Sequence, residues 1–170
     1  MTPVLETARL RVRQLNLEDA PFILELLNDP LFLRFVGDKG VRTVEAARGY
    51  LEQGPLASYA KHGFGLWHVA LKSSGEAIGM CGLIKRDVLE DVDVGFAYLP
   101  QFSGQGYATE AAAAALRHGY TQLGLKRIVA ITAPDNVASQ NVLKKIGLRH
   151  TQTIRLPAYK DDSYLFTPAT

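Results

Sequence analysis

The fold is decided by the stretch Leu99-Pro100-Gln101-Phe102-Ser103-Gly104-Gln105-Gly106-Tyr107-Ala108-Thr109-Glu110-Ala111, in which two glycines join a strand-like run to an alanine-rich helix. The first N–H groups of a helix have no intrahelical partner and lie at the positive end of the helix dipole. Gly104 and Gly106 lack a Cβ, so they tolerate positive φ and let backbone amides approach a bulky anion closely. The stretch therefore predicts a cradle for phosphate oxygens at the start of a helix.

Sequence periodicity places the other elements around this cradle. Short or alternating apolar runs predict strands over residues 9–14, 64–72, 77–86, 92–99, 126–132, 148–156 and 162–167. Helical spacing predicts helices over residues 17–28, 43–61, 105–122 and 136–146, the first of them ending at Pro30. The turn residues Ser73-Ser74-Gly75-Glu76 predict a hairpin. Hairpins followed by strand–helix–strand indicate an α+β fold, with a mixed, mostly antiparallel sheet of six to seven strands and about four helices.

Composition restricts the class of protein. The 170 residues are 47% hydrophobic and 21% charged, which fits one globular domain with one core. The net charge of +2 is too balanced to indicate a partner such as nucleic acid or a membrane surface. One cysteine excludes an internal disulfide, and no signal run or membrane-spanning stretch is visible. We therefore expect a soluble cytoplasmic protein.

Further motifs follow the cradle. The pattern Gln101-x-x-Gly104-x-Gly106, then a strand, then Asn136-x-x-Ser139-x-x-Val142-Leu143-x-Lys145-x-Gly147 resembles the GNAT superfamily of acyl-CoA-dependent N-acyltransferases. The run from Gly104 to Ala111 and the opening Glu6-Thr7-Ala8-Arg9-Leu10-Arg11-Val12-Arg13 are similar to the branch of ribosomal-protein N-terminal alanine and serine acetyltransferases. The resemblance covers nearly the whole chain. It implies a single N-acetyltransferase domain over residues 1–170 that moves an acetyl group from acetyl-CoA, as co-substrate, to a primary amine in a ternary complex.

The resemblance also implies the cofactor contacts. Backbone groups of the strand before the cradle serve the pantetheine arm and the oxyanion, at Phe96, Ala97, Tyr98 and Leu99. Pyrophosphate contacts fall on Ser103, Gly104, Gln105, Gly106, Tyr107 and Ala108, with the Thr109 hydroxyl in the first helical turn. Asn136 matches the residue whose amide holds the pantetheine arm. Lys144 or Lys145 could meet the 3′-phosphate, although a solvated helix face is the favoured interpretation.

Acyl transfer needs a neutral amine, a stabilised oxyanion and a proton for the departing thiolate. Asp93 lies where some GNAT relatives place a catalytic carboxylate, and it could polarise a water; the alternative is a surface aspartate at a strand end. Ser139 matches a serine that related N-terminal acetyltransferases offer as the thiolate acid; the alternative is a hydroxyl that bonds locally in a helix. Tyr98 and Tyr107 are interpreted as packing residues, and Tyr159 as part of the acceptor site, as is Tyr164.

The remaining reactive side chains indicate no second chemistry. His68 alternates with Phe64, Leu66 and Ala70, so a packed histidine is favoured over a base. Cys81 is expected to be a small buried strand residue. The other histidines lack companions at metal-ligand spacing, so no metal is predicted.

Two other classes of protein compete with this interpretation. Gly104-x-Gly106 after a strand also occurs in dinucleotide-dependent oxidoreductases, but the third glycine position is Thr109 and too little chain follows. A protein of the same fold that binds acyl-CoA as a sensor or scaffold, without turnover, stays open. The acceptor, a peptide N-terminus or a small-molecule amine, is not chosen by the fold, and a homodimer is left open. We expect the acceptor groove between the early helices and the C-terminal strands, near Asp29, Arg34, Asp38, Lys39, Asp161 and Asp162.

Overall fold

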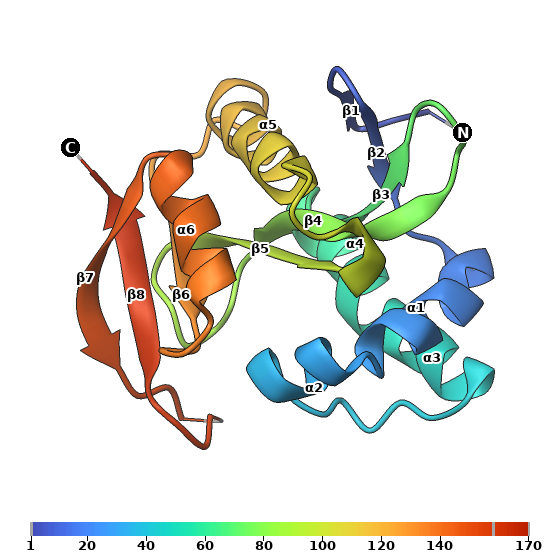
Figure 1. Ribbon diagram of the computed structural model, residues 1–170, viewed down its shortest axis with the longest axis horizontal. Coiled ribbons are helices and arrows are strands. Elements are labelled where there is room, and N and C mark those ends of the chain that lie inside the picture. Colours follow the sequence, from blue (N-terminus) through green and yellow to red (C-terminus); the bar gives the residue numbers. More distant parts are fainter. Residues whose placement is uncertain (1, 158, 170) are drawn as a thin grey trace.

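A computed structural model describes residues 2–157 and 159–169 (Figure 1). Over these residues the chain forms one eight-stranded sheet in the order β1-β2-β3-β4-β5-β6-β8-β7. Its strands are β1 (Leu5–Glu6), β2 (Leu10–Gln14), β3 (Leu66–Leu71), β4 (Ala77–Ile84), β5 (Val92–Tyr98), β6 (Ile128–Thr132), β7 (Leu148–Ile154) and β8 (Ser163–Pro168). Among the strands of the described residues, only β5 and β6 pair in parallel. The predicted α+β class and mostly antiparallel sheet are confirmed. The additional strand is β1, which is too short to show a periodic pattern.

Two prolines make the helices differ from the prediction. The helices are α1 (Ala20–Leu27), α2 (Pro30–Phe35), α3 (Val44–Leu51), α4 (Ala57–His62), α5 (Tyr107–Thr121) and α6 (Val137–Lys145). Pro30 starts α2 rather than ending the first helix, because proline suits the first helical position and Asp29 caps that helix. The predicted helix at 43–61 is interrupted by the π-helical turn Glu52–Leu56, where Pro55 lacks the N–H that an α-helical bond needs.

Helices cover both faces of the sheet (Figure 1). One core lies under α5 and α6 and includes Trp67, Val94 and Leu143. The other lies under α1 and α3 and includes Ile23, Leu51 and Met80. Helix α5 buries a row of small side chains, Ala111, Ala112, Ala114 and Ala115, so its axis can approach β4 and β5 closely. In the described part of the chain, none of the helices has the length and apolar character to span a bilayer.

The sheet opens where β5 and β6 separate. Their parallel pairing joins only Val92 to Ile128 and Asp93 to Val129. Beyond this point β6 pairs with β8, from Ala130 onward, while β5 continues along β4. The second half of β5 therefore keeps a partner on its β4 side and has an open edge toward β6.

Candidate active site

The predicted cradle follows directly from the end of β5. A 3₁₀ turn, Pro100–Phe102, leads into Gly104 with φ 73° and Gly106 with φ 85°, and Gly106 is the N-cap of α5. A side-chain cap cannot come from a glycine, and α5 makes no side-chain cap bond. The amides of its first turn are therefore left for solvent or an anion.

The predicted pyrophosphate residues gather on this corner. Ser103, Gly104, Gln105 and Gly106 are exposed, and Tyr107, Ala108 and Thr109 are half-buried. The Ser103 hydroxyl donates a hydrogen bond to the Pro100 carbonyl at 2.8 Å, which tightens the 3₁₀ turn. The corner therefore presents backbone and small side chains to solvent, as an anion cradle requires.

The open edge of β5 continues this surface. The Leu99 N–H donates to the Ile78 carbonyl of β4 at 2.9 Å. Because backbone groups alternate sides along a strand, the amides of Phe96 and Tyr98 point away from β4, toward the open edge. The side chain of Tyr98 packs in the α5 core beside Cys81, and burial raises the pKa of both groups, that of Cys81 to about 12. Cys81 is thus a buried packing residue, and Tyr98 is a half-buried one, as predicted.

The N-terminal turn contributes a contact that the sequence analysis missed. Arg9 Nε donates to Glu110 Oε1 at 2.7 Å, and Arg9 Nη1 donates to the Gln105 carbonyl at 2.9 Å. The guanidinium also lies 4.4 Å from the centre of the Tyr107 ring. Thr7 donates its hydroxyl to the same Glu110 carboxylate. Arg9 and Glu110 each belong to a motif recognised in the sequence, but no local pattern indicates that two residues 101 positions apart are in contact.

A cavity of about 360 Å³ lies beside this contact. It is lined by Ala8, Arg9, Leu71, Lys72, Ser73 and Tyr107. Lys72 Nζ donates to the Thr7 carbonyl at 3.0 Å and lies 3.9 Å from Glu6 Oε2. The cavity therefore places two cationic side chains next to the first turn of α5.

Asp93 lies on the sheet face opposite α5, where strand alternation predicts it. Only 1% of the residue is exposed, and its Oδ1 accepts a hydrogen bond from Arg86 Nε at 3.0 Å. Burial raises the pKa of Asp93, and the Arg86 guanidinium opposes that rise. Arg86 Nη1 donates in turn to the Tyr159 hydroxyl at 3.0 Å. The carboxylate, the guanidinium and the phenol thus form one chain of contacts, which the sequence analysis did not connect.

The start of α6 holds the other two predicted side chains. Asn136 is the N-cap of α6, and its Oδ1 accepts a hydrogen bond from the Ser139 N–H at 3.3 Å. Ser139 is half-buried in the first turn, while Lys144 and Lys145 are exposed in the last turn. The two lysines therefore lie at the far end of α6 from Asn136 and Ser139.

The acidic residues expected in the acceptor groove are largely engaged in local contacts. Asp29 caps α2, Asp38 pairs with Arg42, and Asp162 pairs with Arg155. Arg34 of α2 lies 3.3 Å from Asp135, in the loop before α6, and both side chains are more than 60% exposed. Among these expected groups, Arg34 is the one that links the early helices to the β6–α6 corner.

His68 is packed in the core, as favoured from the sequence. It is 5% exposed and lies 5.6 Å from the Phe22 ring, centre to centre. Burial lowers the pKa of His68 to about 4. The imidazole is therefore neutral at physiological pH.

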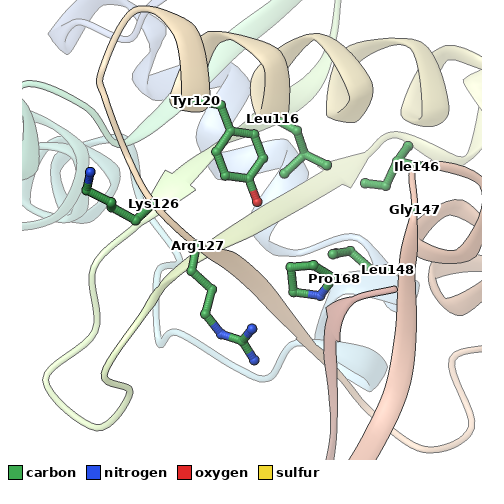
Figure 2. Close-up of a pocket in the computed structure, with 8 residues that line it drawn as sticks. All are labelled: Leu116, Tyr120, Lys126, Arg127, Ile146, Gly147, Leu148 and Pro168. Atoms are coloured by element: carbon green, nitrogen blue, oxygen red, sulfur yellow. The ribbon is translucent and has the colours of Figure 1, made fainter. Parts of the chain in front are cut away.

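A second cavity, of about 430 Å³, lies at the C-terminal ends of α5 and α6, away from the cradle and from Asn136 (Figure 2). Its lining residues are Leu116, Tyr120, Lys126, Arg127, Ile146, Gly147, Leu148 and Pro168. None of the predicted site residues lines it. In the described part of the chain, no group of three histidine, cysteine, aspartate or glutamate side chains is arranged to hold a metal ion.

Comparison with known proteins gives the family. Residues 9–149 match the acetyltransferase (GNAT) domain. The N-acetyltransferase YnaD of Bacillus subtilis is 29% identical over 145 residues, covering 85% of this chain and 82% of that protein. The FsC-acetyl coenzyme A-N(2)-transacetylase of Aspergillus fumigatus is 31% identical over 159 residues, covering 89% of this chain and 67% of that protein.

The fold is shared with solved acetyltransferase structures. RimL, a ribosomal L7/L12 alpha-N-protein acetyltransferase solved in complex with coenzyme A, superposes with a TM-score of 0.83 at 16% identity, over 98% of this chain and 97% of that one. The chain belongs to the GNAT acetyltransferase family and is an acyltransferase, as the motifs predicted.

Proposed function

We propose that this chain, acting as one N-acetyltransferase domain, binds acetyl-CoA along β5 and the α5 cradle and transfers its acetyl group to a primary amine in a ternary complex. The observation that carries the proposal is the open edge of β5, which runs directly into an uncapped helix start. An extended arm can pair with the edge while a pyrophosphate binds the helix amides. The open edge and the helix start follow one another along the chain, as the pantetheine arm and the pyrophosphate follow one another in coenzyme A.

Each cofactor contact then has a chemical reason. The amides of residues 103–108 and the Thr109 hydroxyl bind the pyrophosphate. The outward amides of Phe96 and Tyr98 hold the pantetheine arm and donate to the oxyanion that forms when the amine attacks the thioester carbonyl. Asn136 has its Oδ1 engaged in capping α6, so its NH₂ group is the part that we assign to the pantetheine arm.

The transfer itself forms a C–N bond and breaks the C–S bond. The amine gives up one proton, and the thiolate of CoA takes one. We assign the first proton to Asp93, through a water, because a carboxylate that is 1% exposed and bound to Arg86 cannot touch the amine directly. We assign protonation of the thiolate to the Ser139 hydroxyl at the start of α6, which takes a replacement proton from water as it gives up its own, while Asp93 later releases the amine proton to solvent.

The acceptor is a peptide N-terminus or a small-molecule amine. The proteins that this chain resembles include one named for the ribosomal protein L7/L12 and another named for FsC, so the family alone does not choose between these classes. Arg86 and Arg34 are each paired with an aspartate, Asp93 and Asp135, so these pairs give the expected acceptor side no net charge that would select among amines.

A binding experiment followed by an acceptor screen tests the function. At a concentration of acetyl-CoA 100 times its Kd, the free energy of unfolding should rise by about 2.7 kcal/mol, which is several degrees in melting temperature. Release of free CoA is then measured with short peptides of varied N-terminal residue and with small amines. The absence of a thermal shift at millimolar acetyl-CoA contradicts the proposal. Binding without CoA release across the whole panel favours the non-catalytic sensor or scaffold.

A further inference from the structure

We propose that Arg9 is a positioning residue for acetyl-CoA, because its guanidinium ties the N-terminal turn to the cofactor loop and orients the Gly106 amide. This inference rests on the proposed binding of acetyl-CoA at the cradle. It adds to that site a residue from near the N-terminus, 96 positions before Gln105 of the cofactor loop.

The contacts of Arg9 surround Gly106 on both sides. Its Nη1 holds the carbonyl of Gln105, its guanidinium lies over the ring of Tyr107, and its Nε holds the carboxylate of Glu110. The backbone N–H of Arg9 also donates to Glu110 Oε2, at 2.9 Å. We call the Arg9–Glu110 pair, with the Gln105 carbonyl, the N-terminal clasp.

The bond to the Gln105 carbonyl has a direct geometric consequence. The peptide between Gln105 and Gly106 is planar and trans, so its C=O and N–H groups point in opposite directions. When Arg9 holds the carbonyl, the Gly106 N–H is held pointing away from Arg9. Glycine would otherwise leave this peptide plane free to rotate, because Gly106 has many accessible backbone conformations. The clasp therefore reduces the disorder that a bound pyrophosphate would have to remove.

The clasp also controls the charge near the cradle. A carboxylate in the first turn of a helix stabilises the helix, but it repels a phosphate bound at the same end. Although burial opposes the shift, the hydrogen bonds from Thr7 and Arg9 lower the pKa of Glu110, so this carboxylate is ionised. Arg9 compensates that charge within 2.7 Å. Removal of the Arg9 side chain would leave the Glu110 carboxylate without its cationic partner, one helical turn from the phosphates, with only the Thr7 hydroxyl and the backbone N–H of residue 9 still donating to it.

Arg11 provides a matched control on the same strand. Its Nε contacts Glu6 Oε1 at 2.7 Å, and its side chain is 48% exposed, against 45% for Arg9. No contact joins Arg11 to the described residues of the cofactor loop. Arg11→Ala therefore removes an equivalent surface ion pair without touching the clasp.

The experiment compares two thioester donors, acetyl-CoA and acetylpantetheine, which lacks the pyrophosphate. Arg9→Ala should lower kcat/KM for acetyl-CoA roughly tenfold through KM, with kcat nearly unchanged and with little effect on acetylpantetheine. Arg9→Lys should recover part of the loss, because lysine restores the charge but cannot hold Glu110 and Gln105 together. Arg11→Ala should behave as the wild type with both donors.

Equal losses with both donors, or an unchanged KM for acetyl-CoA in Arg9→Ala, would overturn the proposal and leave Arg9 a structural residue. Circular dichroism and thermal unfolding without ligand check that each variant folds. If Arg9→Ala does not fold, Arg9→Lys is used in its place, with a smaller loss expected only for acetyl-CoA. If the wild type binds acetyl-CoA without turnover, the Kd values of CoA and pantetheine replace the kinetic constants. A wild type that does not bind acetyl-CoA refutes the proposed function first and this inference with it.

Discussion

Replacing Gly106 by alanine adds a Cβ at the N-cap of α5, where φ is 85° and the new atom would lie 3.2 Å from Arg9 Nη2. An L-residue in this left-handed region costs about 1–2 kcal/mol. The close contact adds a second effect, because the guanidinium must shift and its bond to the Gln105 carbonyl then weakens. We expect a loss of stability of about 1–2 kcal/mol, or roughly 2–8 °C in melting temperature for a chain of this size. We also expect weaker binding of acetyl-CoA by roughly tenfold or more.

Gly124→Ala separates the two effects. Gly124 has φ 68°, and no heavy atom lies within 4 Å of the Cβ that alanine would add there. It follows the C-terminal end of α5, away from the cradle. Both variants should therefore lose similar stability without ligand, measured by thermal unfolding, but only Gly106→Ala should lose affinity for acetyl-CoA, measured by calorimetry. A wild-type Kd in Gly106→Ala would refute the reasoning, because the cradle conformation would then be irrelevant to binding.

Three further predictions concern side chains of the site and the core. Ser139→Ala should lower kcat roughly 10²-fold in a steady-state assay and leave the Kd of acetyl-CoA nearly unchanged, because the thiolate needs its proton only as the intermediate collapses; weaker binding with a normal kcat would mean that the hydroxyl serves binding or capping. Asp93→Asn should move the alkaline optimum of the pH–rate profile upward, because the amine must then lose its proton without the carboxylate; an unmoved profile contradicts a role in proton transfer. For His68, burial lowers the pKa from 6.5 to about 4, so its contribution to stability is complete above pH 6.5 and is lost as the pH falls through 4. At 1.36 kcal/mol per pKa unit, this lowers the free energy of unfolding by about 3 kcal/mol. When the free energy of unfolding is measured at pH 7 and at pH 4, it should therefore fall less between the two pH values in His68→Leu than in the wild type.

Local patterns predicted the elements that depend on neighbours in the sequence. The hairpin forms around Ser73 and Gly75, where the turn residues predicted it. Helix α5 begins directly after Gly106, where the glycines of the cradle predicted a helix start. Pro30 misled the prediction because proline is compatible both with the residue after a helix and with the first residue of one. Only the cap from Asp29 decides that a second helix begins there.

The arrangement of the candidate site depended on contacts between distant residues. Strand alternation placed Asp93 on the correct face of β5, but burial against Arg86 depends on the path of the loop after β4. The same holds for Arg9 and Glu110, which stand in separately recognisable motifs and meet only because α5 lies across β2 and the N-terminal turn. The strength of such pairs depends on burial and geometry, which residue spacing does not describe.

The sequence by itself determined the cradle, because glycine conformation, helix capping and the helix dipole act within a few residues of one another. The tertiary structure alone decided that β6 leaves β5 after Asp93 to pair with β8, since a strand carries no local record of which neighbour it joins or where that pairing ends. It also decided that Arg9, from the N-terminal turn, donates a hydrogen bond to the Gln105 carbonyl in the cradle. Both depend on burial of two apolar faces around one sheet, which brings together residues that no local pattern connects.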